Sequence, residues 1–282
     1  MTLEDLAEDP TLEKVRSLAR KRLIAALSGK EFHTEDLAED PKLEVHSFVA
    51  AKLIASEAGP QVLARLANYE AKRFLRLCQR LSLDQLKALA KEAFGVELKG
   101  DAELWIDLAS YLKGASKIGG RKWRLVNRVV VKGYVSVNRY ELERILSEYV
   151  RDNVLRTRRV DLPENLKRIS EEIAEIFKKS VPKSSKKGNE REIPPCIREV
   201  MEKIRRGENV SHQARFAVTA YLLSIGWKEE QILDFLRSLP DFKEKVAAYQ
   251  VSHIAKKKYK PPSCETLMNW GLCLPDCGRR RG

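Results

Sequence analysis

The sequence lacks any uninterrupted apolar run of the roughly 18 residues that a membrane-spanning helix needs. Its N-terminus, MTLEDLAEDP, is acidic and lacks the basic and apolar segments of a signal peptide. We therefore expect a cytoplasmic protein that has no membrane partner. The 282 residues suffice for one large domain or two ordinary ones, and a hydrophobic fraction of 43% suits a globular chain.

Common catalytic motifs are also missing. The chain has no GxxxxGK[ST] loop, no HExxH pair and no Asp-x-Asp on a strand pattern that could hold the metal ions of a nucleotide polymerase. The nearest acidic pair, Asp101 and Glu103, falls in a stretch that we predict to be helical. We therefore expect no catalytic site of its own in this chain.

Negative charge is scarce in the later part of the chain. Lys and Arg outnumber Asp and Glu by 53 to 40, and the whole excess lies after residue 100. A basic surface of this kind favours a polyanion, most simply nucleic acid. The alternative is a solvated Lys, Arg and Glu surface of the thermophilic kind, although such surfaces are usually balanced in sign.

The apolar spacing predicts a mainly α fold. Residues 1–115 are typical of helices, and the heptapeptide EDLAEDP at residues 4–10 and 35–41 predicts a duplicated helical hairpin. The segments WRLVNRVVV and YVSV predict two strands joined by a turn at Lys132-Gly133. Asn138 and Glu141 then predict a capping box at the start of the next helix.

A polar segment divides the chain. A helix over residues 163–179 fades into VPKSSKKGNEREIPP, which is typical of a solvated linker. We predict a helical domain over 1–180 with a small α/β element near 118–160, and a linker over 181–192. A separate all-α C-terminal domain follows over 193–282.

Cysteine is rare, and four of the five cysteines fall in the predicted C-terminal domain. The fifth, Cys78, lies on an apolar helical stripe, which is typical of a core residue. The four are spaced C-x67-C-x8-C-x3-C. Without a secretion signal a metal centre is favoured over disulfides, and the spacing leaves structural zinc and an iron–sulfur cluster open. The four are Cys196, Cys264, Cys273 and Cys277.

Several motifs occur in order around these cysteines: IPPC, ENVSHQARF, LLSIGW, YQVSHI, YKPPSCETL, GLC and DC. Together they resemble the C-terminal domain of the large subunit of archaeal and eukaryotic DNA primases, and a helical domain with a small α/β element also fits that family. The resemblance implies that Cys196, Cys264, Cys273 and Cys277 hold one [4Fe–4S] cluster per chain. It also implies a longer tail than the five residues that follow Cys277.

The resemblance implies a non-catalytic, regulatory subunit of a heterodimer in DNA replication. The catalytic small primase subunit performs nucleotidyl transfer in that family. The large subunit binds template DNA and the 5′-triphosphate of the initiating nucleotide or RNA primer.

A phosphate-binding face is predicted at the start of one helix. Ser211 suits an N-cap, and His212 and Arg215 follow on one face of the first turn. Free backbone N–H groups and the positive end of the helix dipole favour an anion there, and arginine adds a bidentate grip. The resemblance agrees, because the matching His and Arg of the family contact the 5′-triphosphate. The alternative is that both side chains are simply solvated.

A second binding face is predicted where Tyr249, His253 and Lys257 share one side of a helix at i, i+4 and i+8. An aromatic side chain beside cations suits single-stranded DNA or a primer–template junction. A lysine-rich face that is merely solvated is the alternative.

The resemblance also implies that the small α/β element docks on the catalytic subunit. We expect Tyr134 and Val135 to be exposed near that contact. The alternative is that both pack onto the following helix.

Two other classes of protein share some of these features. A cluster-bearing DNA repair glycosylase needs a tighter cysteine grouping and a catalytic Lys/Asp pair, which we do not find. A zinc-dependent DNA-binding protein would be colourless, whereas an iron–sulfur protein is brown.

Overall fold

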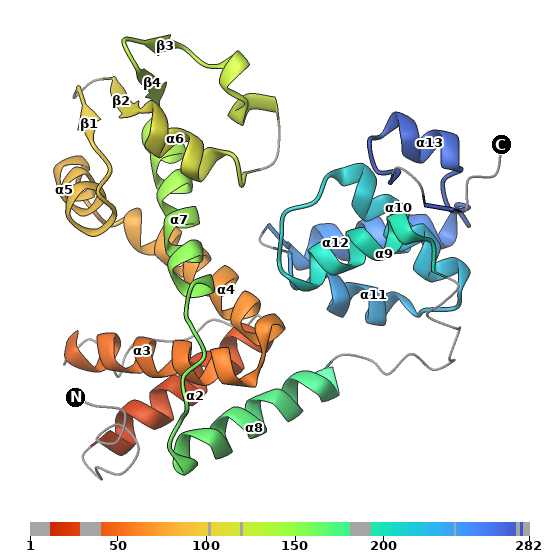
Figure 1. Cartoon of the computed structure of the whole chain (residues 1–282), viewed down its shortest axis with the longest axis horizontal. Helices are drawn as coiled ribbons and strands as arrows, with labels where there is room; N and C mark the ends of the chain where they lie inside the picture. The colour runs from red at the N-terminus through yellow and green to blue at the C-terminus, as the bar shows by residue number, and fades with distance from the viewer. Residues whose placement is uncertain are drawn as a thin grey trace.

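The computed structural model describes residues 12–28, 41–100, 103–118, 121–180, 193–239, 241–274 and 277–278. Within these ranges the chain is mainly α with one small antiparallel sheet, which confirms the predicted fold class (Figure 1). None of the helices in these ranges is both long and apolar enough to cross a membrane.

The first group of helices packs around one apolar core. These helices are α2 (Glu13–Ser28), α3 (Pro41–Ala58), α4 (Pro60–Cys78) and α8 (Glu164–Ser180). Gly59 separates α3 from α4 with a φ of 131°, which residues with a side chain rarely adopt, and Pro60 starts the next helix. The EDLAEDP copies lie outside the described residues apart from Pro41, so the duplicated hairpin stays a prediction.

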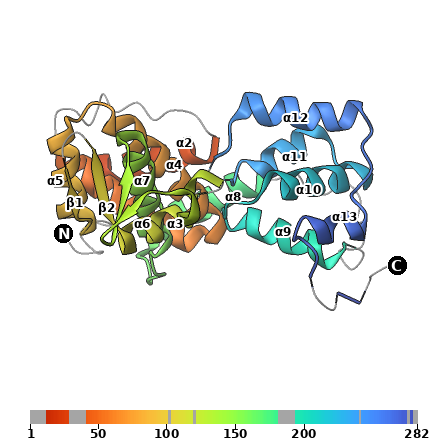
Figure 2. The same ribbon diagram turned by 90° about the horizontal axis from the view of Figure 1, so that it is seen from above.

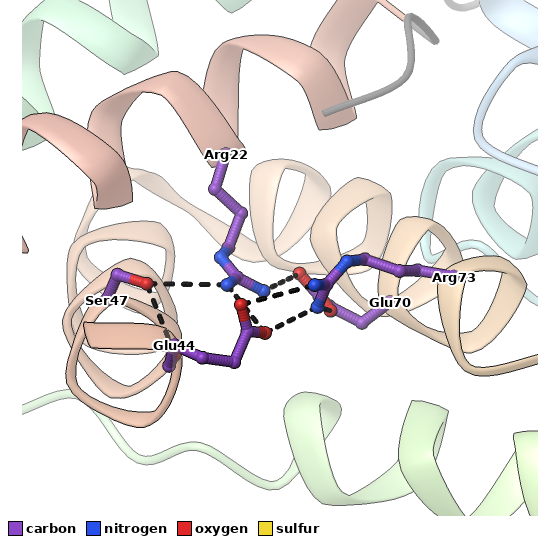
Figure 3. Close-up of polar contacts among 5 residues, drawn as sticks. All are labelled: Arg22, Glu44, Ser47, Glu70 and Arg73. Atoms are coloured by element: carbon purple, nitrogen blue, oxygen red, sulfur yellow. Dashed lines mark hydrogen bonds and ion pairs between the residues drawn. The ribbon is translucent and has the colours of Figure 1, made fainter. Parts of the chain in front are cut away.

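A buried ion-pair network joins α2, α3 and α4 (Figure 3). Arg22 is fully buried and donates hydrogen bonds to Glu70 Oε1 at 2.7 Å and Glu44 Oε1 at 2.8 Å. Arg73 donates to Glu44 Oε2 at 3.2 Å. Burial raises the pKa of Glu44, but the hydrogen bonds and charges of Arg73 and Arg22 outweigh burial and lower it overall. Each buried charge is therefore paired, which burial in a low dielectric requires.

The small α/β element is built on a four-stranded antiparallel sheet in the order β1-β2-β4-β3. Its strands are β1 (Leu98–Lys99), β2 (Leu104–Asp107), β3 (Val130–Val131) and β4 (Tyr134–Val137), and its helices are α5 (Leu83–Phe94), α6 (Leu108–Ala115) and α7 (Arg139–Leu155). Lys132 and Gly133 form the predicted turn with φ values of 47° and 81°, because a type I′ hairpin needs positive φ at both positions. The predicted capping box between Asn138 and Glu141 starts α7.

The helical prediction for residues 1–115 is wrong at the sheet. Residues 98–99 and 104–107 form β1 and β2, and Glu103 directly precedes a strand rather than lying in a helix. The reason is tertiary: β2 pairs with β4 and buries Leu104 and Ile106 against that distant segment.

The first predicted strand, over residues 123–131, is also shorter than expected. Only Val130–Val131 pairs with β4, because Arg121–Trp123 and Leu125–Asn127 form two 3-10 turns. Trp123 is buried in the core of the element, so its apolar character reflects packing rather than a strand.

The C-terminal helices surround a core of their own. They are α9 (Pro195–Arg205), α10 (His212–Ser224), α11 (Glu229–Leu236), α12 (Glu244–Lys256) and α13 (Cys264–Asn269). Ser211 caps α10 as predicted, since its Oγ accepts a hydrogen bond from the Ala214 N–H at 3.2 Å. The predicted linker over 181–192 lies outside the described residues, so the domain boundary stays a prediction.

The C-terminal helices lie beside α4 and α7 (Figures 1 and 2). Three buried side chains donate to backbone carbonyls across this contact: Arg65 to Asp234 at 3.1 Å, Asn68 to Ser238 at 2.6 Å, and Arg151 to Gly207. Gly207 has a φ of 67°, and a Cβ there would lie 3.0 Å from Ala64 Cβ. Glycine therefore permits the close approach of the two parts of the chain.

Candidate functional site

The four predicted cysteine ligands come from three segments of the C-terminal part. Cys196 lies in the first turn of α9, Cys264 is the first residue of α13, and Cys273 and Cys277 follow that helix. All four are free thiols. Helix α13 lies at the end of the molecule remote from the N-terminal helices (Figure 2).

Cys264 and Cys273 lie within electrostatic range of Cys196. Burial raises the pKa of the Cys196 thiol, the backbone N–H groups of Ile197 and Cys196 lower it, and the two other thiols raise it again. Within the part of the chain that the structure describes, no three His, Cys, Asp or Glu side chains are arranged to hold a metal ion. Four cysteine sulfurs have the chemistry of a thiolate-bound centre, and since burial raises the pKa of Cys196 overall, its deprotonation has to come from metal binding.

Arg215 is held in place by several acceptors at the start of α10. Its guanidinium donates to both carboxylate oxygens of Asp241 at 2.8 Å, to Asn209 Oδ1 at 3.0 Å and to the Val210 carbonyl at 3.0 Å. The side chain of Arg215 is 23% exposed and that of Asp241 is 45% exposed. Arg215 is thus ordered by protein contacts rather than simply solvated, whereas His212 is exposed.

His212 and Arg215 both line a cleft of about 540 Å³ between the two parts of the chain. One wall comes from α4 and α7, and the other comes from α10, α12 and the segment between α11 and α12. Two carboxylates and five cationic side chains line it; the five are Lys72, Arg144, Arg151, Arg215 and Lys243. Sequence analysis missed four of these five, because packing of distant helices makes them neighbours.

The predicted binding face on α12 is exposed. Tyr249 is 72% exposed and its ring stacks on His253, with the centroids 6.0 Å apart and an angle of 23° between the planes. Lys257 is exposed at the end of the helix. The ring of Tyr259 lies 6.1 Å from that of His253 and extends the aromatic surface. Sequence analysis missed Tyr259, although an aromatic residue within the lysine-rich segment 256–260 is a signal for it.

The hairpin exposes other residues than expected. Val135 is fully buried, so the expectation that it is exposed is wrong: alternation along β4 directs it toward the core opposite Ile106. Tyr134 is partly exposed, and Lys99 Nζ lies 3.9 Å from its ring centroid. The large apolar residues exposed nearby are Val126, Val129, Val130 and Val131.

Comparison with known proteins gives consistent matches. Residues 186–277 match the family of C-terminal domains of eukaryotic and archaeal DNA primase large subunits. The chain is 32% identical to the DNA primase large subunit of Methanocella arvoryzae, over 97% of this chain and 78% of the relative. It is 30% identical to that of Methanococcoides burtonii, over 97% and 81%. It is 31% identical to that of Archaeoglobus fulgidus, over 82% and 64%.

Proposed function

This chain belongs to the family of archaeal DNA primase large subunits, and on that premise we propose that it is the regulatory, non-catalytic half of a primase heterodimer. A catalytic small subunit performs nucleotidyl transfer. This chain holds the template DNA and the 5′ end of the new RNA primer while that transfer takes place.

The main support for this proposal is the position of His212 and Arg215. Both lie on the first turn of α10 and line a basic cleft. Free N–H groups at a helix start favour a phosphate, and an arginine binds phosphate oxygens in a bidentate manner. Only the initiating nucleotide keeps its 5′-triphosphate in the primer. A triphosphate site on this chain therefore acts on primers made de novo, whereas extension of a preformed primer with a 5′-hydroxyl does not use it.

Tyr249, His253 and Lys257 are the proposed contacts to DNA or primer. An exposed tyrosine stacked on a histidine offers a ring face to a base, and such stacking contributes about 1–3 kcal/mol per base. Lys257, at the end of the same helix, adds a cation for the phosphate backbone.

Cys196, Cys264, Cys273 and Cys277 are the proposed ligands of one [4Fe–4S] cluster. When bound, the cluster cross-links α9 to α13 and the segment after it, which lie more than 50 residues further along the chain. Metal binding deprotonates these thiols, which offsets the raised pKa that burial gives Cys196.

The hairpin is the proposed docking surface for the catalytic subunit. Tyr134 remains a contact residue, and the exposed edge strand β3 adds Val130 and Val131 beside it. Tyr134→Ala should weaken co-purification with the catalytic subunit, and Tyr249→Ala, which alters an exposed aromatic residue of α12, should not. If both variants co-purify with the catalytic subunit equally well, the hairpin is not part of the interface.

Reconstitution with a catalytic small subunit tests the function as a whole. On a single-stranded template, this chain alone should synthesise nothing, and its addition to the small subunit should increase the number of new primers. Primer synthesis by this chain alone, or a small subunit whose initiation does not respond to it, would refute the proposal.

A further inference from the structure

The cleft beside Arg215 carries more positive charge than the predicted site explains. Lys72 of α4 and Arg144 of α7 reach it from the N-terminal part, and Lys243 lies next to the start of α12. Arg144 Nη1 is anchored by Ser147 Oγ and by Glu148, each at 2.7 Å, which holds the guanidinium at the wall of the cleft.

Lys72 lies among like charges. Its Nζ donates to the Phe242 carbonyl at 3.0 Å. Burial lowers the pKa of Lys72, Asp241 opposes that effect, and repulsion from nearby cations, Arg144 among them, lowers the pKa further. An anion added here would relieve this repulsion.

The carboxylate of Asp241 lies beside Arg215 in the cleft, where we expect an anionic ligand to bind. Both of its oxygens accept hydrogen bonds from Arg215 at 2.8 Å, and its charge also acts on Lys72. Phosphate offers arginine the same paired oxygen acceptors as a carboxylate. Because Asp241 is 45% exposed, it can leave Arg215 and enter water without becoming a buried unpaired charge.

We propose that a 5′-triphosphate displaces Asp241 from Arg215 and is held from the opposite wall of the cleft by Lys72 and Arg144. This inference rests on the proposed function and deepens it, because it makes the N-terminal part a component of the triphosphate site. The volume of about 540 Å³ is in the range of small-molecule sites, about 300–1,000 Å³. A bound triphosphate thereby links the two parts of the chain.

Equilibrium binding to the full chain tests the inference with three probes at one salt concentration: GTP, a short RNA with a 5′-triphosphate, and the same RNA with a 5′-hydroxyl. Lys72→Met should weaken binding of the triphosphate probes about tenfold, which is typical of one charge-assisted hydrogen bond. Asp241→Asn should tighten it severalfold, a gain that misfolding does not produce. Arg168→Gln is the matched control, since Arg168 is an exposed cation of α8 outside the cleft.

The outcomes separate the inference from the proposed function. If Arg215→Ala weakens triphosphate binding while Lys72→Met and Asp241→Asn match the wild type, the inference is overturned and the proposed site stands. If Arg215→Ala also matches the wild type, both are overturned. Equal effects on the 5′-hydroxyl RNA overturn the inference as well, because the cations then act as a general RNA-binding surface. Effects confined to the two triphosphate probes support the inference. The probe whose binding changes more, GTP or the triphosphate RNA, shows whether the site takes its triphosphate from a free nucleotide or from a primer end.

Discussion

Removing the Arg215 side chain is the sharpest test of the proposed role of this protein in starting a primer. In the structure the guanidinium binds Asp241, Asn209 and the Val210 carbonyl. In the proposed displacement by a triphosphate, the bonds to Asp241 are exchanged for bonds to phosphate, while the contacts to Asn209 and Val210 keep the side chain in position. Arg215→Ala therefore removes one bidentate, charge-assisted contact, and the Ser211 cap that starts α10 remains.

The size of the effect follows from that exchange. Hydrogen bonds to a charged group contribute about 1.5–3 kcal/mol, and an exposed ion pair of the kind formed with Asp241 is worth about 0.2–1 kcal/mol. The difference leaves about 0.5–2.8 kcal/mol for the net contribution of Arg215. This corresponds to a roughly two- to hundredfold loss of triphosphate affinity in the variant.

Two reactions of the reconstituted heterodimer, run at one salt concentration, measure the effect of Arg215→Ala. De novo synthesis of primers should fall by that factor at subsaturating nucleotide, whereas extension of a preformed primer with a 5′-hydroxyl should change little. Arg168→Gln removes an exposed arginine outside the cleft and should leave both reactions unchanged. Equal losses of initiation and extension in Arg215→Ala would refute the reasoning, because Arg215 would then belong to a diffuse basic surface.

Three further predictions concern the cluster and the core. Anaerobically purified protein should contain about four irons per chain, and Cys264→Ser or Cys273→Ser should lose them; stoichiometric zinc without iron by mass spectrometry would contradict the cluster. Cys78 is buried as predicted, and burial raises its pKa to about 12, so iodoacetamide at about pH 8 should label it only after denaturation. Prompt labelling of the folded chain would contradict that burial. Arg22→Met should lower the free energy of unfolding in urea by about 3–5 kcal/mol, because it removes the hydrogen-bond donor of the buried Glu70 and leaves Glu44 with Arg73 alone. Since folding lowers the pKa of Glu44, that stabilisation is complete above its ordinary value of 4.5 and is lost as the pH falls through the folded value. The stabilities of variant and wild type should therefore converge in acid, and a constant difference down to low pH would contradict the role of Glu44.

Local features of this protein were predictable from its sequence. The capping box of Asn138 and Glu141, the Ser211 cap and the turn at Lys132-Gly133 each depend on residues within four positions of one another. The order of motifs around the cysteines likewise sufficed to indicate the family. Such features depend on backbone geometry and neighbouring side chains, which a short stretch of sequence specifies.

Other features depend on which distant segments meet. The strand β2 exists because it pairs with β4, and that same pairing buries Val135. The cleft has its charge because α4 and α7 pack beside the C-terminal helices, which brings Lys72 toward Arg215. Asp241 engages Arg215 across 26 positions of the chain, and no local pattern reports that contact. Pairings of this kind arise only when folding buries the surfaces between segments, so the tertiary structure alone reveals them.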